Sequence, residues 1–255
     1  MPGKATTGLT PAQFDELVSR VDAKVIWDCG WGRPPALTLR QAVKAVVMYF
    51  RTNIAQEVIA ELLFVDQSAI SRVIADLEEA IAEVLEEFVP DLTEELRGRV
   101  GVVDGSLTPC WSWADAPELY SGKHKRTGHS HQLVADTSGD LLHVSDPLPG
   151  KTHDAKAVND TGTAALLDLD NCIGDKGYLG TGLITPFRKP PGGELLPWQK
   201  EFNTAVNKIR YVVERAIANF KTWRCMHTDY RRPLSTYDTA FRAVRALHFS
   251  KLRFA

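Results

Sequence analysis

The spacing of apolar residues changes near residue 99, and this change limits the folds open to the chain more than any other feature. Before it, apolar residues recur every three or four positions, which predicts amphipathic helices. After it, short apolar runs bounded by turn residues predict strands. We therefore expect an all-α domain over residues 1–98 and a mixed α/β domain over residues 99–255.

A chain of 255 residues is long enough for one large domain or two small ones. No apolar run approaches the roughly 18 residues that a membrane helix needs, and the polar residues after Met1–Lys4 do not resemble a signal peptide. The cysteines form no C-x-x-C pair, so we expect reduced thiols in a cytoplasm rather than a zinc site. They are Cys29, Cys110, Cys172 and Cys225.

Residues 55–85 are predicted to form two helices joined by a tight turn, which is the shape of a helix-turn-helix. The start of the second helix carries polar side chains that suit the reading of base edges in the major groove. They are Gln67, Ser68, Ser71 and Arg72. The alternative is a plain helical hairpin packed on its neighbours.

Charge is distributed unevenly along the chain. Residues 76–95 contain many carboxylates and no basic residue, so only the first turns of the second helix are expected to touch DNA. Residues from Lys200 onward are rich in Lys and Arg. This positive tail either meets a phosphate backbone or forms a solvated helical surface.

Two short apolar runs each end in an aspartate with a glycine close behind it. Val100–Val103 predicts a strand ending at Asp104, and a run ending at Ile173 leads to Asp175. A carboxylate at the end of a strand is held still enough to bind a metal ion. Taken alone, Asp-Gly after an apolar run is more often a turn.

The other elements predicted after residue 99 alternate between strands and helices. They are strands at 130–135 and 140–144 joined by a turn at 136–139, a helix over 155–167, a short strand at 184–187 and a long helix over 200–223. This order predicts a ribonuclease-H-like (retroviral-integrase-like) core.

The long helix is predicted to carry its polar residues on one narrow face. At about 100° per residue, Asn207, Arg210, Glu214 and Lys221 lie together, and the apolar residues lie opposite. Glu214 is then either a site residue or an ordinary exposed glutamate with Arg210 one turn away as its partner.

In combination, these features resemble the DDE transposases of bacterial insertion sequences, in particular the insertion-sequence-five group and its Harbinger-type relatives. The motifs that carry the resemblance are Val103–Ser106, Tyr120–Lys125, Pro149–Gly150 with His153–Asp154, Gly174–Tyr178, and the R-x3-E-x6-K pattern of Arg210, Glu214 and Lys221. One departure is Asn207, where part of the wider superfamily has Tyr. We expect it to change the positioning of DNA strands and not to abolish activity.

The resemblance implies a site of three carboxylates, Asp104, Asp175 and Glu214, that binds two Mg²⁺ ions, with Mn²⁺ as a substitute. Such ions, roughly 4 Å apart, clamp the attacking and leaving oxygens of an in-line displacement. Asp104 is expected to bridge both ions. Asp154 is a further candidate ligand, although capping of a helix is its more usual role and we expect it to lie farther off.

The basic residues near these motifs are expected to hold DNA phosphates. They are Lys123, Lys125, Arg126, Arg210, Arg215 and Lys221. His153 either orients the scissile phosphate or is simply a loop histidine.

The resemblance predicts a DNA transposase that acts on terminal inverted repeats and target DNA, as a homodimer, at the bacterial nucleoid in the cytoplasm and not in a membrane. Two alternatives remain open from the sequence. One is a catalytically silent DNA-binding regulator derived from a transposase, and the other is a general nuclease with the same core.

Overall fold

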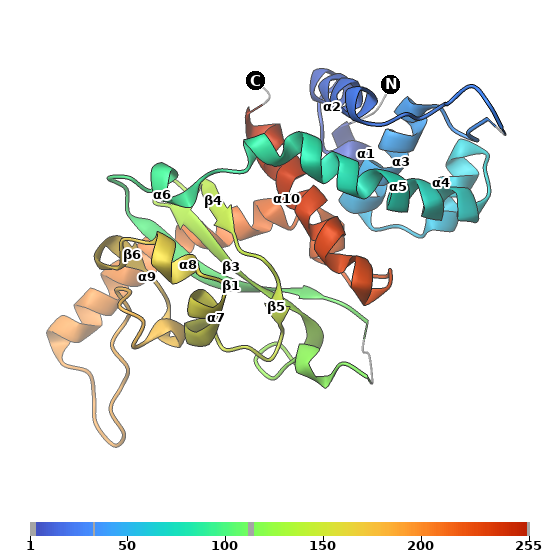
Figure 1. The fold of residues 1–255 in the computed structure, drawn as a ribbon. Coiled ribbons are helices and arrows are strands. Elements are labelled where there is room, and N and C mark those ends of the chain that lie inside the picture. The colour runs from blue at the N-terminus through green and yellow to red at the C-terminus, as the bar shows by residue number, and fades with distance from the viewer. Residues whose placement is uncertain (1–3, 33, 112–114, 254–255) are drawn as a thin grey trace. The chain divides into compact units, whose positions relative to one another are not determined.

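The computed structural model describes residues 4–32, 34–111 and 115–253, and its ribbon is shown in Figure 1. The described residues divide into two compact units. Residues 4–89 and 221–253 form one unit, and Pro90–Phe220 forms the other. The expected boundary near residue 99 is close to the first division. Residues 221–253, which were expected in the α/β domain, instead pack with the N-terminal helices.

The first unit is made of helices. They are α1 (Lys4–Thr7), α2 (Pro11–Lys24), α3 (Leu39–Thr52), α4 (Gln56–Leu63), α5 (Gln67–Leu85) and α10 (Tyr237–Arg253). Thr10 and Thr38 start α2 and α3 with capping boxes, in which the threonine hydroxyl accepts from the backbone of a glutamine three residues later. These helices agree with the helical spacing of apolar residues predicted before residue 99.

Helix α10 explains why the C-terminal residues belong to the first unit. It packs along α5, and its inner side buries Tyr237, Phe241 and Val244 completely. The guanidinium of Arg232 donates to the Glu78 carboxylate on α5, at 2.9 Å for one of the two bonds. Arginines of the positive tail therefore neutralise part of the acidic run of α5, which the sequence alone did not predict.

Helices α4 and α5 form the predicted helical pair, with a short turn at residues 64–66. Phe64 ends α4 in the left-handed region, with φ of 56°, and the Gln67 side chain donates to Gln56 at 2.6 Å across the turn. Ser68 and Arg72 are exposed on the first turns of α5, and Ser71 is half-buried. The polar side chains that the sequence predicts to contact DNA bases are thus largely exposed at the start of α5.

The second unit is built on a sheet. Its strands are β1 (Gly101–Pro109), β2 (Tyr120–Ser121), β3 (Arg126–Asp136), β4 (Leu141–Val144), β5 (Leu148–Pro149) and β6 (Cys172–Ile173). Strand β3 pairs antiparallel with β1, β2, β4 and β5, whereas β6 pairs parallel with β1. The turn at 136–139 connects β3 to β4 as predicted.

Strand β1 is longer than the sequence pattern predicted. It continues past Asp104 to Pro109, because β3 offers paired backbone groups along the whole length, from Asp136 opposite Gly101 to Gly128 opposite Pro109. Asp104 therefore lies within a strand, opposite Leu133, and not at the end of one. The apparent Asp-Gly turn is part of the sheet.

The α-helices that the structure describes in the second unit are α6 (Leu92–Glu95), α7 (Asp154–Asp160), α8 (Thr163–Leu166) and α9 (Pro197–Phe220). The single helix expected over 155–167 is interrupted by Gly162, whose φ is 72°. The strand expected at 184–187 is reduced to one parallel bridge between Ile184 and Ile173. Figure 1 shows α7 and α8 in front of the sheet and α9 behind it.

The core in front of the sheet joins the strands to α7 and α8. It contains Val103 and Val134 from the two central strands, Val158 from α7 and Tyr178 from the turn after β6, all without exposed surface. No helix among the described residues is both long and apolar enough to cross a membrane. The packing places the start of α7 against the middle of β1, where Asp154 approaches Gly105.

Candidate active site

Asp104 is a half-buried carboxylate in the middle of β1. Its Oδ1 accepts a hydrogen bond of 2.9 Å from the backbone N–H of Gly105. Burial raises the pKa of Asp104 to about 6, and the charge of Asp175 adds to the shift, whereas Arg210, the Gly105 N–H and Lys123 oppose it. This carboxylate is therefore short of compensating positive charge.

Asp175 follows β6, the strand that lies beside β1. Gly101 and Val102 of β1 pair with Cys172 and Ile173, so a residue just after β6 lies near Asp104. The Oδ1 of Asp175 accepts a hydrogen bond of 2.7 Å from the backbone N–H of Gly177 and caps the short turn Lys176–Tyr178. The pairing of β1 with β6 is what brings these two aspartates together.

Asp154 lies in the same cluster, so the expectation that it lies farther off is wrong. Its Oδ1 is 2.5 Å from the position that a Cβ on Gly105 would occupy. Its Oδ2 is 2.8 Å from the corresponding position on Gly177, where the Oδ1 of Asp175 is at 2.7 Å. Asp154 begins α7, and α7 packs against β3 and the 176–178 turn, which carries the carboxylate into the cluster.

Tyr178 is a buried residue whose hydroxyl is affected by the charges of all three aspartates. Burial raises the pKa of the Tyr178 hydroxyl well above its ordinary value, and the charges of Asp154, Asp104 and Asp175 raise it further. This hydroxyl donates to the Oε1 of Gln132 at 2.6 Å. Tyr178 therefore stays protonated, and its position marks the shared environment of the three carboxylates.

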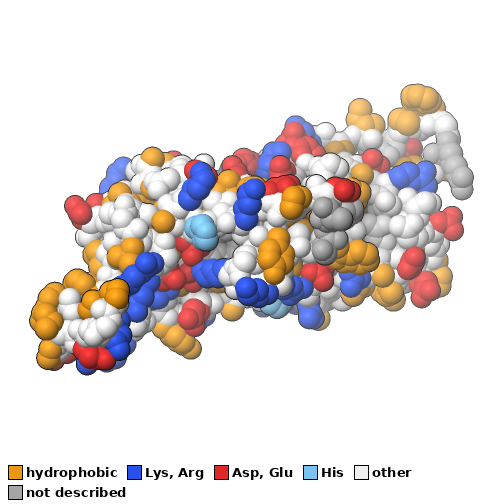
Figure 2. Space-filling model, turned by 90° about the horizontal axis from the view of Figure 1, so that it is seen from below, with side chains coloured by type: hydrophobic (Ala, Val, Ile, Leu, Met, Phe, Trp, Pro, Cys, Tyr) orange, Lys and Arg blue, Asp and Glu red, His pale blue; other side chains and the backbone are white. Residues whose placement is uncertain are grey.

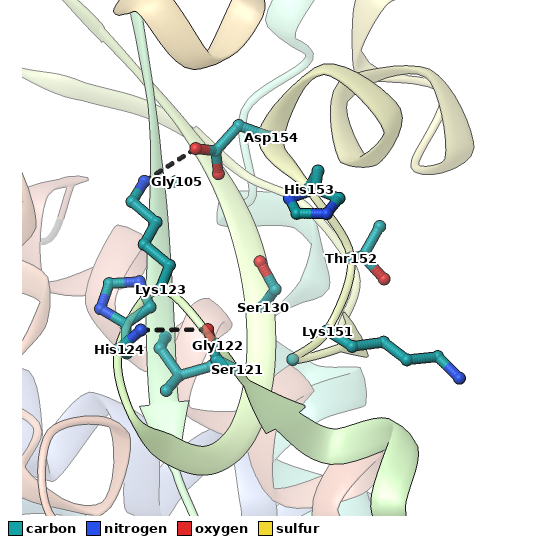
Figure 3. Close-up of a pocket in the computed structure, with 12 residues that line it drawn as sticks. Gly105, Ser121, Gly122, Lys123, His124, Ser130, Lys151, Thr152, His153 and Asp154 are labelled. Atoms are coloured by element: carbon teal, nitrogen blue, oxygen red, sulfur yellow. Dashed lines mark hydrogen bonds and ion pairs between the residues drawn. The ribbon is translucent and has the colours of Figure 1, made fainter.

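Lys123 supplies positive charge to this cluster. Its Nζ lies 2.7 Å from the Oδ2 of Asp154, whose side chain is 13% exposed. Burial alone would lower the pKa of Lys123, but the bond to Asp154 and the charges of Asp175 and Asp104 raise it overall. Figure 3 shows the lysine reaching from its loop to the carboxylate.

A cavity of about 130 Å³ lies beside this ion pair. Figure 3 shows that the 121–124 turn and the 150–154 loop face each other across it, with Gly105 of β1 at its edge. Its polar side chains include Ser121, His124, Ser130, Lys151, Thr152 and His153. Three motifs that are far apart in the sequence thus meet around one cavity.

Helix α9 contributes Arg210 to the electrostatics of the site. The charge of Arg210 lowers the pKa of Asp104, so this guanidinium lies near the carboxylate. Its buried Nε has no hydrogen-bond partner among the described residues. Glu214, one turn later, is exposed, and Arg215 donates to the carbonyl oxygen of Ser138.

The remaining predicted DNA-binding residues lie around the site or in the other unit. Lys125 has a left-handed backbone, with φ of 54°, and precedes Arg126, the first residue of β3; both are exposed. His153 is exposed at the N-cap of α7. Lys221 lies just beyond α9, at the start of the segment that packs with the N-terminal helices.

The aspartates fit a divalent cation by their chemistry, because Mg²⁺ and Mn²⁺ prefer carboxylate oxygens. Among the described residues, no three His, Cys, Asp or Glu side chains are already arranged to ligate one ion, and Lys123 occupies the carboxylate of Asp154. The positive charge at the cluster comes from Lys123 and Arg210. The donor set is thus suitable, and Glu214 as a ligand stays a prediction.

Sequence reasoning missed two features of this site. The first is the close approach of Asp154 to Gly105 and Gly177, for which the glycines of the two Asp motifs were the available signal. The second is Gln132, which lies opposite Gly105 on β3 and has no exposed surface. No local pattern marks Gln132, because its role depends on strand register.

Comparison with known proteins agrees with the motifs. Residues 103–248 match the family described as DDE superfamily endonuclease. A protein of Streptomyces albus G named "Putative transposase for insertion sequence element IS112" is 33% identical over 223 residues, which cover 86% of this chain and 83% of that protein. A protein of Microchaete diplosiphon named "Probable transposase for insertion sequence element IS702" is 26% identical over 238 residues, 89% of this chain and 86% of that protein.

No solved structure matches the chain. The family match covers more than half of the chain and includes Asp104, Asp154, Asp175 and Glu214. The chain belongs to the family of DDE superfamily endonucleases.

Proposed function

We propose that this chain is a DNA transposase that binds the ends of an insertion sequence and catalyses metal-dependent phosphodiester cleavage and strand transfer. The observation that carries the proposal is the pairing of β1, which contains Asp104, with β6, which Asp175 follows by two residues. The names of the two relatives point to the same function. The proposal extends the family's endonuclease chemistry to the joining of DNA ends.

Asp104, Asp175 and Glu214 are the proposed ligands of two Mg²⁺ ions, for which Mn²⁺ substitutes. Asp104 is half-buried, its pKa is raised to about 6, and a cation beside it would favour its charged form. Glu214 is on α9, which packs against β1 and β3 and also carries Arg210. When bound, such ions stabilise the negative charge that develops on the phosphate and lower the pKa of an attacking water.

The basic side chains have the separate task of holding the DNA backbone. Arg210 and Lys123 are close enough to Asp104 to lower its pKa, so a phosphate held by them would lie beside the carboxylates. On the face shown in Figure 2, Lys and Arg side chains lie on either side of an acidic patch. Lys125, Arg126, His153 and Lys221 are proposed as further backbone contacts. We expect this binding to weaken steeply with salt.

Recognition of the element's ends is proposed for the helical pair α4 and α5, acting as a helix-turn-helix. Gln67, Ser68 and Arg72 are exposed at the start of α5, and Ser71 is half-buried there. The antiparallel set β4, β3 and β1 with a parallel β6 supports a ribonuclease-H-like core for the second unit. The proposed partners are terminal inverted repeats and target DNA, bound by a homodimer at the nucleoid of a bacterial cytoplasm.

The decisive experiment is cleavage of a DNA duplex that carries the terminal repeats flanking the element, with Mg²⁺ or Mn²⁺. Asp104→Asn is expected to reduce strand cleavage by at least about a hundredfold, more than the loss of an outer-shell partner typically causes. DNA binding, measured by gel shift, is expected to persist. Cleavage by the variant at the wild-type rate would overturn the metal assignment.

The same assay separates the two other candidate functions. Specific binding of the repeats by the wild-type chain, without nicking in either metal, would identify a silent regulator. Cleavage without joining of the 3′-OH end to a target duplex would identify a general nuclease.

A further inference from the structure

We propose that Asp154 is a ligand of the divalent cation together with Asp104 and Asp175, and that Lys123 occupies its carboxylate until the cation binds. This inference rests on the proposed function and adds a residue to its metal site. Helix capping, the usual role of such an aspartate, does not describe its position. Asp154 is the first residue of α7, and the N-cap is His153, whose side chain makes no capping hydrogen bond.

The first observation is the space in which the carboxylate lies. A Cβ on Gly105 would approach the Oδ1 of Asp154 to 2.5 Å, and a Cβ on Gly177 would approach its Oδ2 to 2.8 Å. Atoms that close must move apart, so both positions need glycine while Asp154 stays where it is. The two glycines therefore leave room for the Asp154 carboxylate to lie against the motifs that carry Asp104 and Asp175.

The second observation is the proximity of Asp154 to Asp175. One oxygen of each carboxylate lies within 2.8 Å of the same point, the Cβ position of Gly177. Two like charges in a partly dry site repel each other unless a cation compensates them. Lys123 compensates one, through the 2.7 Å contact of its Nζ with the Oδ2 of Asp154.

The third observation is an open hydrogen-bond donor in the same place. The Nε2 of Gln132 is buried and has no hydrogen-bond partner among the described residues. It lies 3.6 Å from the Gly105 Cβ position, the point that the Oδ1 of Asp154 also approaches. A buried donor left open costs stability, so it points to a ligand oxygen that would accept from it.

The Lys123 ammonium can be displaced from the Asp154 carboxylate by a divalent cation. Its side chain is 52% exposed, it comes from the 121–124 turn, and its long stem can turn the ammonium toward solvent or a phosphate. A divalent cation carries more charge than the ammonium and can be shared by several carboxylates. The two cations therefore compete for Asp154.

The test measures Mn²⁺ affinity by calorimetry on the full chain without DNA, so it does not depend on activity. Asp154→Asn is expected to weaken Mn²⁺ binding at least about tenfold. Lys123→Met is expected to strengthen it, by about threefold or more, because a competing positive charge is removed. Lys151→Met, at a lysine that lines the same cavity and whose side chain shows no contact with Asp154, is the matched control and should leave the affinity unchanged.

The opposite directions of the two variants exclude a purely structural role. If Asp154 served only to pair with Lys123, both variants would lower the free energy of unfolding and neither would change Mn²⁺ affinity, which would overturn the proposal. Asp104→Asn separates this failure from that of the proposed function. Loss of Mn²⁺ binding in Asp104→Asn but not in Asp154→Asn would overturn only the role of Asp154, whereas unchanged binding in both would overturn the metal site itself.

Discussion

At the scale of single residues, the site depends on two glycines as much as on its carboxylates. Gly105 and Gly177 each follow a motif aspartate, and neither has a left-handed backbone. Their absence of a side chain is needed for space alone, because an oxygen of Asp154 lies within 2.8 Å of where each Cβ would be. The second glycine also donates its backbone N–H to Asp175.

Gly177→Ala tests this use of space. The new Cβ would lie within 2.8 Å of oxygens from both Asp154 and Asp175, so at least one carboxylate must turn away. We expect Mn²⁺ affinity to fall at least about tenfold, with a loss of about 1–3 kcal/mol in the free energy of unfolding. Calorimetry and urea denaturation measure the two quantities.

Gly122→Ala is the matched control for the loss of stability, because a Cβ there would meet no atom within 4 Å. Equal losses of stability in both variants would show that the close contacts at Gly177 do not cause the destabilisation. Wild-type metal affinity in Gly177→Ala would show that the two carboxylates can bind without the observed approach.

At the scale of secondary-structure elements, α10 adds a buried titratable group to the helical unit. Burial, with the charges of Lys251 and Arg51, lowers the pKa of His248 on this helix to about 3. Between about pH 3 and pH 6.5, this histidine is protonated in the unfolded chain, where its pKa is near 6.5, and neutral in the folded chain. The contribution of His248 to stability is therefore complete above pH 6.5 and is lost as the pH falls toward 3.

His248→Phe is expected to remove this source of acid sensitivity. For the wild type, the free energy of unfolding should fall by up to about 1.4 kcal/mol per pH unit from this group between pH 6.5 and pH 3. The variant should show a shallower decline over that range, measured by urea denaturation at a series of pH values. Parallel curves for the two chains would contradict the assignment to His248.

The periodicity of apolar residues predicts helices of the first unit but not the extent of strand β1. The helices α4 and α5 lie within the 55–85 segment where apolar spacing predicts two helices, and α2 and α3 begin at threonines that form capping boxes. Strand β1 does not end at Asp104, because an Asp-Gly pair with turn propensity is held in the sheet by nine paired residues of β3. Pairing with a distant strand overrides a local preference when it satisfies the backbone groups of both.

At the scale of the whole molecule, residues far apart in the sequence are joined within each compact unit. Arg232 and Glu78 form a pair in which the side chains are only 8% and 6% exposed. Nearby, Arg242 and Glu79 form a pair in which they are 40% and 45% exposed. The two pairs link the same segments and differ mainly in their burial.

This difference predicts unequal effects of breaking each pair. Glu78→Gln should lower the free energy of unfolding by about 3–5 kcal/mol, because it leaves a buried guanidinium without its carboxylate. Glu79→Gln, the matched substitution at the exposed pair, should cost less than about 1 kcal/mol. Equal losses in urea denaturation would contradict the burial of the first pair.

The sequence by itself determined the motifs, the change from helical to mixed α/β patterning along the chain, and the family. It also placed Asp104 and Asp175 each beside a short apolar run, because apolar spacing and glycine placement are local signals. Tertiary structure alone decided that Asp154 joins these aspartates, that Lys123 pairs with it and that residues 221–253 pack with the N-terminal helices. These facts depend on strand register and on how helices dock, and both follow from contacts between distant residues that no local pattern encodes.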